Sequence, residues 1–506
     1  MISESAVLRI GRSVLAEYEA SRFYRALLRL GRSFAAKCRE SAILSFLFRD
    51  GSPDRSWSGS LTCRVLTFLL SLPGVLLHLL YRRFQKTFDE SRIAGLLFEV
   101  GDSAAILESW LLLGLWVIPF RRWNNAYHLM GFLLLLGFLW LWQMRSGKKL
   151  RLDRIGFYPV LLFGAACLAV LSSLYPWLSG RFLRYHIICA LCVLTTVNSV
   201  RSAADMKRLL FGVSCMVLVS AVYGLIQRAQ GIAVEARYVD LSLNSGMPGR
   251  VQSYFDNPNT YAQVLVLLLP PVLGLTVCAK RRISRVGAAF VLLMGLLAIG
   301  MTYSRSGWIG LAAAVLFFVL LRKPKLVPAL ILAAILCVPL LPKSIVNRIL
   351  TIGLVGRDTS VTSRFPLYRA GFRLICARPL LGAGLGIDAV REYIIDYNVY
   401  YTMIYYSHLH DLFLQVWAET GLPGIVGLVG SSFWGMKHMV RAQRRPGSRT
   451  VKVLTAACCS ALAGGLLVGV VDYIWHYPRV MCMFWFVFAL GLSGVRLLIE
   501  GEDAHE

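Results

Sequence analysis

Charged residues are scarce in this sequence. Only 16% of the 506 residues are Asp, Glu, Lys or Arg, whereas 57% are hydrophobic. Soluble globular domains carry about 25% charged residues, so the composition excludes an ordinary soluble domain. Apolar runs of about 17 to 25 residues, the length that spans a bilayer as a helix, recur along the whole chain. The sequence therefore predicts an all-α polytopic membrane protein.

Acidic residues are the rarer charge. The chain has 27 Asp and Glu against 54 Lys and Arg, which gives a formal net charge of +27. Such a charge is also typical of nucleic-acid-binding proteins, but here the Lys and Arg residues cluster in short segments between apolar runs. Clusters of this kind mark the cytoplasmic loops of membrane proteins. We therefore expect a lipid bilayer as partner and no nucleic acid.

Motifs of several other classes are missing. No glycine-rich nucleotide loop ending in GK[ST] occurs, and no internal repeat of the kind found in many secondary transporters. Most of the 12 cysteines lie inside apolar runs, where cysteine acts as a small apolar residue. The one CxxC pair, Cys189 and Cys192, has no second pair to complete a zinc site. We predict no disulfide framework, no metal site and no cofactor.

The N-terminal region, residues 1–93, is a basic arm. Residues 1–60 alternate basic and apolar positions, as an amphipathic helix on anionic lipid does. Residues 65–81 are apolar but interrupted by Pro73-Gly74. We predict a re-entrant or interfacial segment there, with a true span as the alternative. No cleavable signal peptide is expected, because the arm is too long and lacks a small-residue cleavage site.

About twelve spans follow from the remaining apolar runs. They group into an N-terminal bundle (94–258), central spans (259–342), a large extracytoplasmic loop with short helices (343–410), and C-terminal spans with a short tail (411–506). The individual spans are predicted near residues 101–120, 126–143, 156–176, 183–200, 209–227, 259–278, 286–303, 306–321, 326–342, 411–434, 453–472 and 479–498.

The basic loops predict the orientation. If the spans alternate, the strongly basic loops all fall on one side, which should be the cytoplasm together with both termini. Arg121 and Arg122, between the first two spans, fall on the other side and are the exception. The loops that agree are residues 145–154, 201–208, 280–285, 322–325 and 437–452.

The opposite face receives two long segments, 228–258 and 343–410. Loops of this length without clear structure are usually functional. The first contains Arg250 and then the turn Asp-Asn-Pro-Asn. Asp256 or Asn257 is expected to start this turn, while Asn259 or Thr260 is expected to cap the following helix.

Two further arginines and two histidines are expected on this face. Arg305 lies in the very short connection TYSRSG between two spans, and Arg364 begins an amphipathic external helix over residues 364–377. His408, His410 and Asp411 stand at the end of the longest external loop. Taken singly, such arginines commonly snorkel to lipid headgroups, and a lone external histidine is usually an ordinary interfacial residue. Their combination on one face is what indicates a site.

The chemistry of these groups suggests a substrate. Guanidinium forks without a metal suit the oxygens of a diphosphate. An imidazole with a pKa near about 6.5 suits removal of a proton from a hydroxyl group. A diphosphate leaving group, an attacking hydroxyl and a membrane location together indicate transfer of a sugar chain from a lipid diphosphate carrier.

At these residues the sequence resembles the O-antigen ligase and Wzy-type polymerase superfamily of bacterial membrane glycosyltransferases, over roughly residues 200–498. The resemblance rests on GRVQSYFDNPN, the SRSG turn, the large external loop and the histidine motif. In the ligases that motif is His, then Asn, Ser or Gln, then nine residues, then Gly-x-x-Gly. Here His410 is followed by Asp411, nine residues, Gly421 and Gly424, so only the second position departs.

The resemblance implies a membrane fold like that of the C-type glycosyltransferases. It implies a metal-independent, inverting transfer of a glycan from undecaprenyl diphosphate to a glycan, lipid or protein acceptor, on the extracytoplasmic face of a bacterial cytoplasmic membrane. By the family pattern Arg250 and Arg305 hold the diphosphate, with Arg364 beside them, and His410 acts as base or orients the acceptor hydroxyl. Asp411 is expected either to orient the imidazole through a charged hydrogen bond or to show only that the family pattern is loose at this position. His408 is expected to point elsewhere on a helix.

Three functions remain open at this point. A ligase passes a finished polymer to an acceptor, whereas a polymerase uses the same chemistry to extend the chain on the next lipid-linked repeat unit. The third is a non-catalytic polysaccharide transporter. A transporter would be expected to bury ionisable groups within its spans, and Glu99, Asp102 and Glu108 near the first span are the main exceptions in a chain poor in them.

Overall fold

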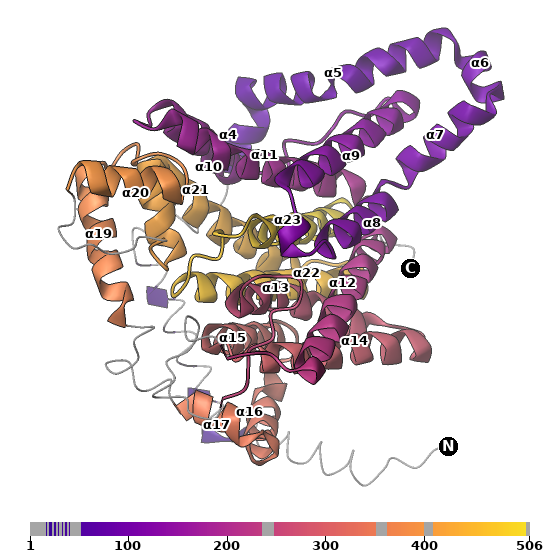
Figure 1. The fold of residues 1–506 in the computed structure, drawn as a ribbon. Helices are drawn as coiled ribbons and strands as arrows, with labels where there is room; N and C mark the ends of the chain where they lie inside the picture. The colour runs from indigo at the N-terminus through magenta and orange to yellow at the C-terminus, as the bar shows by residue number, and fades with distance from the viewer. Residues whose placement is uncertain are drawn as a thin grey trace, which may run out of the picture.

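The computed structural model describes residues 52–234, 247–350, 362–398 and 408–501, together with isolated positions between 17 and 40. Throughout these residues the regular structure is helical and no strand occurs, which confirms the all-α prediction. The predicted amphipathic helix within residues 1–60 falls mostly outside the described residues. The helices pack into one elongated bundle, with α19 and α20 beside it at one edge (Figure 1).

Ten helices in the described part of the chain are long and apolar enough to cross a membrane. Nine of them coincide with predicted spans, and the tenth is α5. They are α5 (Leu61–Arg83), α9 (Asn125–Ser146), α11 (Pro176–Ser199), α12 (Ala203–Gln230), α13 (Pro258–Cys278), α14 (Arg282–Met301), α15 (Arg305–Arg322), α21 (Leu412–Ala442), α22 (Arg449–Gly469) and α23 (Pro478–Glu500).

The other three predicted spans correspond to shorter apolar helices. These are α8 (Ala104–Trp116), α10 (Phe157–Leu171) and the segment Pro324–Leu340, in which α16 (Val327–Cys337) lies between two short 3-10 turns. The apolar run is longer than the helix in the first two because Pro119 follows α8 and Ser172-Ser173 follow α10. An apolar run shows which residues avoid water, but it does not show where the helix ends. Serine and proline can end the helical backbone before the apolar run ends.

The basic loops lie together at one end of the bundle. Arg154 forms an ion pair with Glu500 at the end of α23. Arg322, at the end of α15, donates to the Gln443 side chain at 3.0 Å, and the Cys278 thiol faces the Thr450 carbonyl at 3.7 Å. We call this the basic end. The spans therefore alternate as the charge pattern predicts, while the cytoplasmic location of this end stays a prediction.

Helix α5 is continuous, so the predicted interruption at Pro73-Gly74 is wrong. The indole of Trp140 on α9 donates to the Leu70 carbonyl at 2.8 Å, beside the proline. This bond ties α5 to α9 beside the proline. Gly74 lets α9 approach, because a Cβ there would lie 2.3 Å from the Gln143 side chain.

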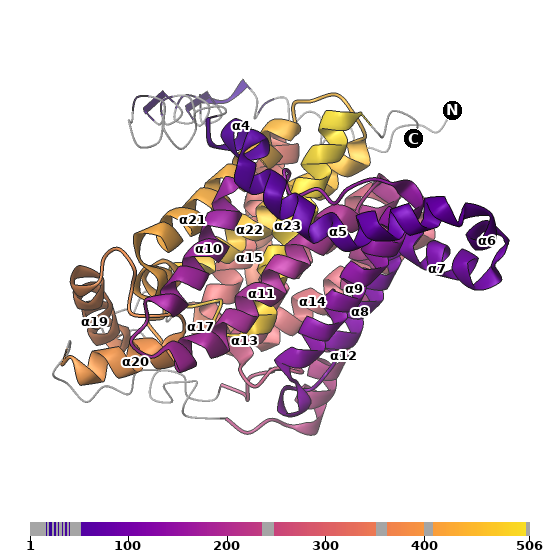
Figure 2. The ribbon, with the colours of Figure 1, turned by 90° about the horizontal axis from the view of Figure 1, so that it is seen from above.

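Helix α5 crosses the end of α9 instead of running along it (Figure 2). His78 faces the Met144 carbonyl at 2.8 Å, and Ser71 accepts from the Leu150 amide at 3.1 Å. Both partners belong to the last turn of α9 and the basic loop that follows it. The interfacial placement of this segment stays a prediction, and contacts restricted to one end of α9 favour it.

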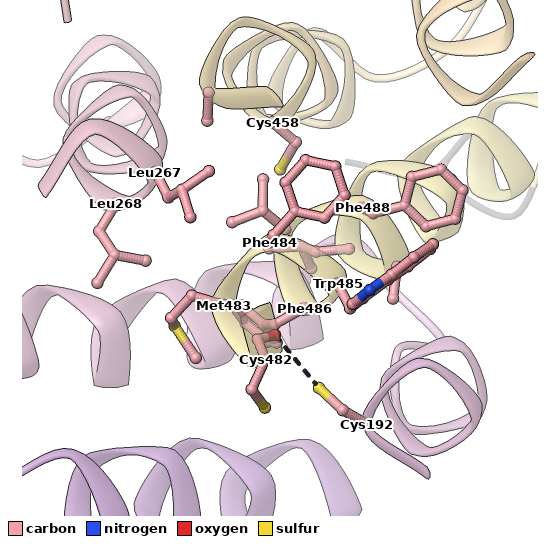
Figure 3. Packing of buried hydrophobic residues seen from close by; sticks show 14 of the residues in the cluster. Cys192, Leu267, Leu268, Cys458, Cys482, Met483, Phe484, Trp485, Phe486 and Phe488 are labelled. Atoms are coloured by element: carbon pink, nitrogen blue, oxygen red, sulfur yellow. Dashed lines mark hydrogen bonds between the residues drawn. The ribbon is translucent and has the colours of Figure 1, made fainter. Parts of the chain in front are cut away.

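The centre of the bundle is formed by α13, α22 and α23. Their most apolar stretches are 72%, 78% and 89% buried, against 17% for α5 and 22% for α14. Aromatic side chains of α23, among them Phe484, Trp485 and Phe488, are fully buried there (Figure 3). All cysteines in the described residues are free thiols; Cys192, for example, directs its thiol at the Cys482 carbonyl at 4.0 Å.

The segment between α16 and α21 carries short helices, as predicted for the large external loop. They are α17 (Lys343–Leu350), α19 (Arg364–Ala377) and α20 (Ile387–Asp396). The predicted amphipathic helix coincides with α19. Its apolar face packs with α20 and the first turns of α21 in a small separate core that includes Leu367, Leu374, Val390, Leu409 and Ala418.

Small residues allow α15 and α22 to approach each other closely. A Cβ on Gly464 of α22 would lie 2.5 Å from the Gly310 carbonyl of α15. We expect Gly464→Leu to lower the stability of the solubilised protein by about 1–3 kcal/mol, because the helices must separate to admit it. Thermal unfolding in detergent would measure this. Gly114→Leu is the control, since a Cβ there meets nothing within 4 Å; an equal loss in both variants would contradict the packing argument.

Candidate active site

The histidine segment precedes α21 and is not helical. Asp411 is the N-cap of α21, and its carboxylate accepts from the Leu414 amide at 2.8 Å. His410 has a φ of 51°, a left-handed conformation that is uncommon for residues other than glycine. The expectation that His408 points away from His410 on a helix is therefore wrong. The two imidazole centroids lie 4.0 Å apart.

Both histidines face one buried carboxylate, Asp472, in the connection between α22 and α23. Its Oδ1 lies 3.1 Å from Nδ1 of His410 and 3.6 Å from Nε2 of His408, and it also accepts from the Tyr473 amide at 2.9 Å. Its Oδ2 accepts from Gln263 of α13 at 2.9 Å. Asp472, not Asp411, is thus the carboxylate that orients the His410 ring.

The electrostatics of this pair follow from its burial. Burial lowers the pKa of His410 below its usual 6.5, and the hydrogen bond to Asp472 opposes that shift in part. Burial by itself would raise the pKa of Asp472, but hydrogen bonds from His408 and His410 and the charge of Arg364 bring it well below its usual value. At neutral pH, Asp472 is therefore ionised and His410 is neutral, with its proton on Nδ1 and its Nε2 able to accept another.

A third imidazole completes this cluster. His476 stacks on His408 with ring centroids 4.6 Å apart and planes 23° from parallel. Burial lowers the pKa of His476 to about 3, so this ring is neutral. Neither His476 nor His410 therefore adds positive charge beside Arg364.

Arg250 is buried and connects two elements of the site. Its Nε donates to the Thr302 carbonyl at 2.6 Å, and its Nη2 donates to the Asn259 side chain at 2.5 Å. Gln263, which contacts Asp472, lies one turn after Asn259 on α13. Arg250 and Asp472 are thus hydrogen-bonded to side chains one turn apart on the same helix, α13.

The turn before α13 differs in one detail from the prediction. Asn257, not Asn259 or Thr260, is the N-cap, and its side chain accepts from the Asn259 amide at 2.8 Å. Pro258 takes the first helical position, where its missing N–H costs nothing. Because Asn257 caps the helix, the Asn259 side chain is available to Arg250.

Arg305 is the first residue of α15, four residues after α14 ends at Met301. The connection is tight, with Thr302, Tyr303 and Ser304 all buried and Tyr303 at a φ of 51°. Ser304 caps α15 by accepting from the Gly307 amide at 3.4 Å. The short, packed turn restricts where the partly exposed Arg305 guanidinium can reach.

Arg348 of α17 supports the same turn and was not predicted. Its Nε donates to the Tyr303 carbonyl at 3.4 Å, and it is buried. The Tyr303 hydroxyl lies 3.0 Å from that of Ser344, also on α17. The external helix α17 therefore packs against the connection that presents Arg305.

Arg364 begins α19 and lies beside the carboxylate. Its Nη1 donates to the carbonyl of Val471, the residue before Asp472, at 2.5 Å. Its charge contributes to the low pKa of both Asp472 and His410. The first turn of α19 is thus fixed against the α22–α23 connection.

Gly421 and Gly424 support the site without contacting it. Gly421 interrupts α21 with a φ of 66°, and a Cβ there would lie 2.1 Å from the Leu380 carbonyl. The amide of Leu422 donates to Pro379 at 2.9 Å, and that of Ala383 donates to Ala418 at 2.8 Å. Gly421 therefore lets the segment after α19 dock on α21, whereas a Cβ on Gly424 would meet the Thr420 side chain of the same helix.

Gln415 and Glu419 hold the histidine segment from within α21, and sequence reasoning missed both. The Gln415 side chain accepts from the Leu409 amide and donates to Glu419, each at 2.8 Å. The Tyr473 hydroxyl donates to Glu419 at 3.3 Å. These bonds tie the residue between the two histidines to the residue that follows Asp472.

The same groups could also hold a metal ion. His408, His410 and Asp472 each offer one ligand atom, and these atoms lie within 4.8 Å of one another. Sequence reasoning predicts no metal site, and it could not find this set because Asp472 is 62 residues from His410. The one signal in the sequence that could have indicated Asp472 is its place at the outer end of a predicted span, on the same face as the histidines.

The hydrogen-bonded pair of His410 and Asp472 predicts that Asp472→Asn changes how activity depends on pH. His410 must be neutral to accept a proton, so activity rises with pH through its pKa, which lies below 6.5. Because Asp472 raises that pKa, its removal should move the acid limb of the pH–rate profile to lower pH. Because the amide no longer orients the ring, kcat should fall at least about 100-fold.

The matched control for this substitution is Asp388→Asn. Asp388 lies on α20 and pairs with Arg391 at 3.5 Å, so its change removes one charge outside the site. Its pH profile should match that of the wild type. A full-rate Asp472→Asn variant with an unmoved acid limb would refute the role of the pair.

Comparison with known families gives a match. Residues 264–429 match the family model described as O-antigen ligase, Wzy_C. The match begins after Arg250 and ends before Asp472, but it includes Arg305 and His410. It confirms the resemblance stated from the sequence over this range. No curated protein matched the chain.

Proposed function

Because residues 264–429 carry an O-antigen ligase domain, we propose that this membrane protein transfers a glycan from undecaprenyl diphosphate to an acceptor hydroxyl. One observation carries the proposal. A neutral imidazole, His410, is held by the ionised Asp472. Arg364 is hydrogen-bonded to the carbonyl of Val471, the residue before Asp472, and Arg250 is hydrogen-bonded to α13, the helix whose Gln263 contacts Asp472. A base and cationic groups are thus fixed relative to each other, as displacement of a diphosphate requires.

The reaction proceeds by displacement at the anomeric carbon. Nε2 of His410 accepts the proton of the acceptor hydroxyl while that oxygen forms a bond to the anomeric carbon. The bond from this carbon to the diphosphate oxygen breaks, and its electron pair leaves with the diphosphate. Attack from the side opposite the leaving group inverts the anomeric configuration. Asp472 stabilises the imidazolium that forms.

The arginines stabilise the charge on the leaving diphosphate. A guanidinium offers planar, paired donors to phosphate oxygens and stays charged at any working pH. Arg305 and Arg364 are partly exposed at the starts of α15 and α19, so they can reach substrate. Arg250 is buried and anchored to Thr302 and Asn259. In this proposal Arg250 contributes positive electrostatic potential and holds neighbouring groups in position. Arg305 and Arg364 make most of the direct contact with the diphosphate.

The face on which this occurs follows from the two ends of the bundle. The basic loops gather at one end, and the cluster around Asp472 lies at the other. Positively charged loops remain in the cytoplasm, so we place the reaction at the extracytoplasmic face of a bacterial cytoplasmic membrane. Glu500, the last residue of α23, lies at the basic end.

Ligase and polymerase remain alternatives within this proposal, because both need a diphosphate clamp and a base. The transporter is disfavoured by the acidic residues near α8. Glu99 is exposed, and Asp102 pairs with Arg145 at 3.4 Å near the basic end. Glu108 alone of the three is buried, where it accepts a hydrogen bond from Thr196. These three residues therefore do not form a pathway of ionisable groups across the bundle.

The proposal predicts the effect of His410→Gln on surface glycans. Glutamine keeps the polar contact but cannot take the proton, so transfer should fall by about 10²–10⁴-fold. The measurement is a size profile of lipid-linked and surface glycans from native-host cells. Full-length polymer left on the lipid carrier would identify a ligase, and single repeat units would identify a polymerase.

His438→Gln is the control, because His438 lies near the other end of α21 beside Trp434. It should leave the profile unchanged. If His410→Gln also left the profile unchanged at equal protein levels, transfer through this histidine would be excluded.

The metal-independent mechanism predicts that activity survives chelation. Treatment of the purified protein with EDTA should leave the transfer rate within about twofold, because arginines replace the metal as the partner of the diphosphate. The assay is transfer from a lipid-linked donor before and after chelation. Loss of activity that zinc or manganese restores would instead assign a metal to His408, His410 and Asp472.

A further inference from the structure

A second feature lies at the basic end of the bundle, away from the candidate active site. Helices α12 and α14 and the end of α13 enclose a cavity of about 800 Å³. Helix α14 runs 20 residues from this cavity to Met301 beside the active-site turn, a distance of about 30 Å. The cavity is within the size of known ligand sites, about 300–1,000 Å³.

The cavity forms because two helices diverge. Deep in the bundle they touch, since a Cβ on Gly295 of α14 would lie 3.0 Å from Val217 of α12. Toward the basic end the α14 residues Ser284, Gly287 and Ala288 are small and line the opening. A Cβ on Gly287 meets nothing within 4 Å. The space is thus a wedge that opens toward the basic loops.

The wedge is apolar inside and cationic at its mouth. On α12 the lining residues Lys207, Phe211 and Cys215 recur every four positions, so they form one stripe that begins with a charge. Lys280 and Arg281 line the opposite side of the mouth. None of the residues that line the cavity is acidic, and nearby Asp205 is paired with Arg208 at 2.8 Å.

We propose that this wedge binds an anionic phospholipid. Its phosphate headgroup lies between Lys207, Lys280 and Arg281, and an acyl chain lies between α12 and α14 against Phe211 and Val291. Basic pockets between membrane helices bind anionic headgroups by this combination of charge and apolar depth. A zwitterionic lipid would bring an ammonium group to a mouth that offers it no carboxylate.

The position of the wedge separates this lipid from the substrate of the proposed transfer. It opens at the end of the bundle opposite Asp472, where the charge pattern places the cytoplasmic leaflet. The lipid would fill the space between α12 and α14, two helices whose lipid-facing surfaces are large. Its expected role is to hold these helices at their separation.

The test measures lipid retention without any glycan transfer. The purified protein is incorporated into nanodiscs of equal parts phosphatidylglycerol and phosphatidylethanolamine, extracted in mild detergent, and examined by native mass spectrometry. Wild type should retain phosphatidylglycerol in excess. The triple variant Lys207→Gln, Lys280→Gln, Arg281→Gln should bind it about 100-fold more weakly, since each charge contributes roughly a factor of five.

Two further variants keep the test decisive. Gly287→Leu adds a side chain where a Cβ meets open space, so it should fold normally and exclude the acyl chain. The charge-matched control Lys323→Gln, Arg444→Gln, Arg445→Gln removes three exposed cations from the same end but outside the wedge. Retention should persist in the control and disappear in Gly287→Leu.

The proposal is overturned by any of three results. Wild type could retain both lipids equally, the control triple could lose phosphatidylglycerol as fully as the wedge triple, or Gly287→Leu could retain it unchanged. The second result would show attraction to the basic surface as a whole. None of these outcomes depends on whether the protein transfers a glycan.

Discussion

The site depends on one buried carboxylate. An ionised group away from water must be paired and hydrogen-bonded, and Asp472 has donors from three separate parts of the chain. His408 and His410 come from the segment before α21, Gln263 comes from α13, and the Tyr473 amide comes from its own connection. If one of these parts moved, the charge would lose a donor. The charge therefore fixes the positions of α13, α21 and α22 relative to each other at this end of the bundle.

Two residues of the candidate active site have strained backbone conformations. His410 and Tyr303 both have a φ of 51°, a conformation that costs free energy for residues with a side chain. The surroundings that hold them are well packed. Leu409 is fully buried beside His410 and its amide is bound by Gln415, while the Tyr303 carbonyl accepts from the buried Arg348. The packing of α17, α19 and α21 thus stabilises a geometry that these short segments would not adopt alone.

The two ends of the bundle carry positive charge in different ways. At the basic end the cations are numerous and mostly exposed, as befits contact with lipid headgroups and water. At the other end Arg250 and Arg348 are buried and each donates to a backbone carbonyl. The first arrangement suits a mobile lipid, and the second suits a substrate whose charged atoms must be held in one place.

The sequence by itself determined the helices, their alternation and the candidate site residues. Arg250, Arg305, Arg364 and His410 were found because each lies in a short local pattern: a turn, a connection, a helix start or a spaced motif. Apolar runs of the right length also located every long helix except α5, whose proline suggested a break. These signals are local, and local backbone preference and hydrophobicity are what a linear sequence records.

The tertiary structure decided which of these groups meet. His410 pairs with a carboxylate 62 residues away, and that carboxylate pairs with Gln263 across 209 residues. Neither residue type is unusual in its own segment. The convergence of His408 on the same oxygen and the cap at Asn257 were likewise set by neighbouring elements. Such contacts arise from how α13, α21 and α22 pack, and packing depends on the shapes of many side chains at once.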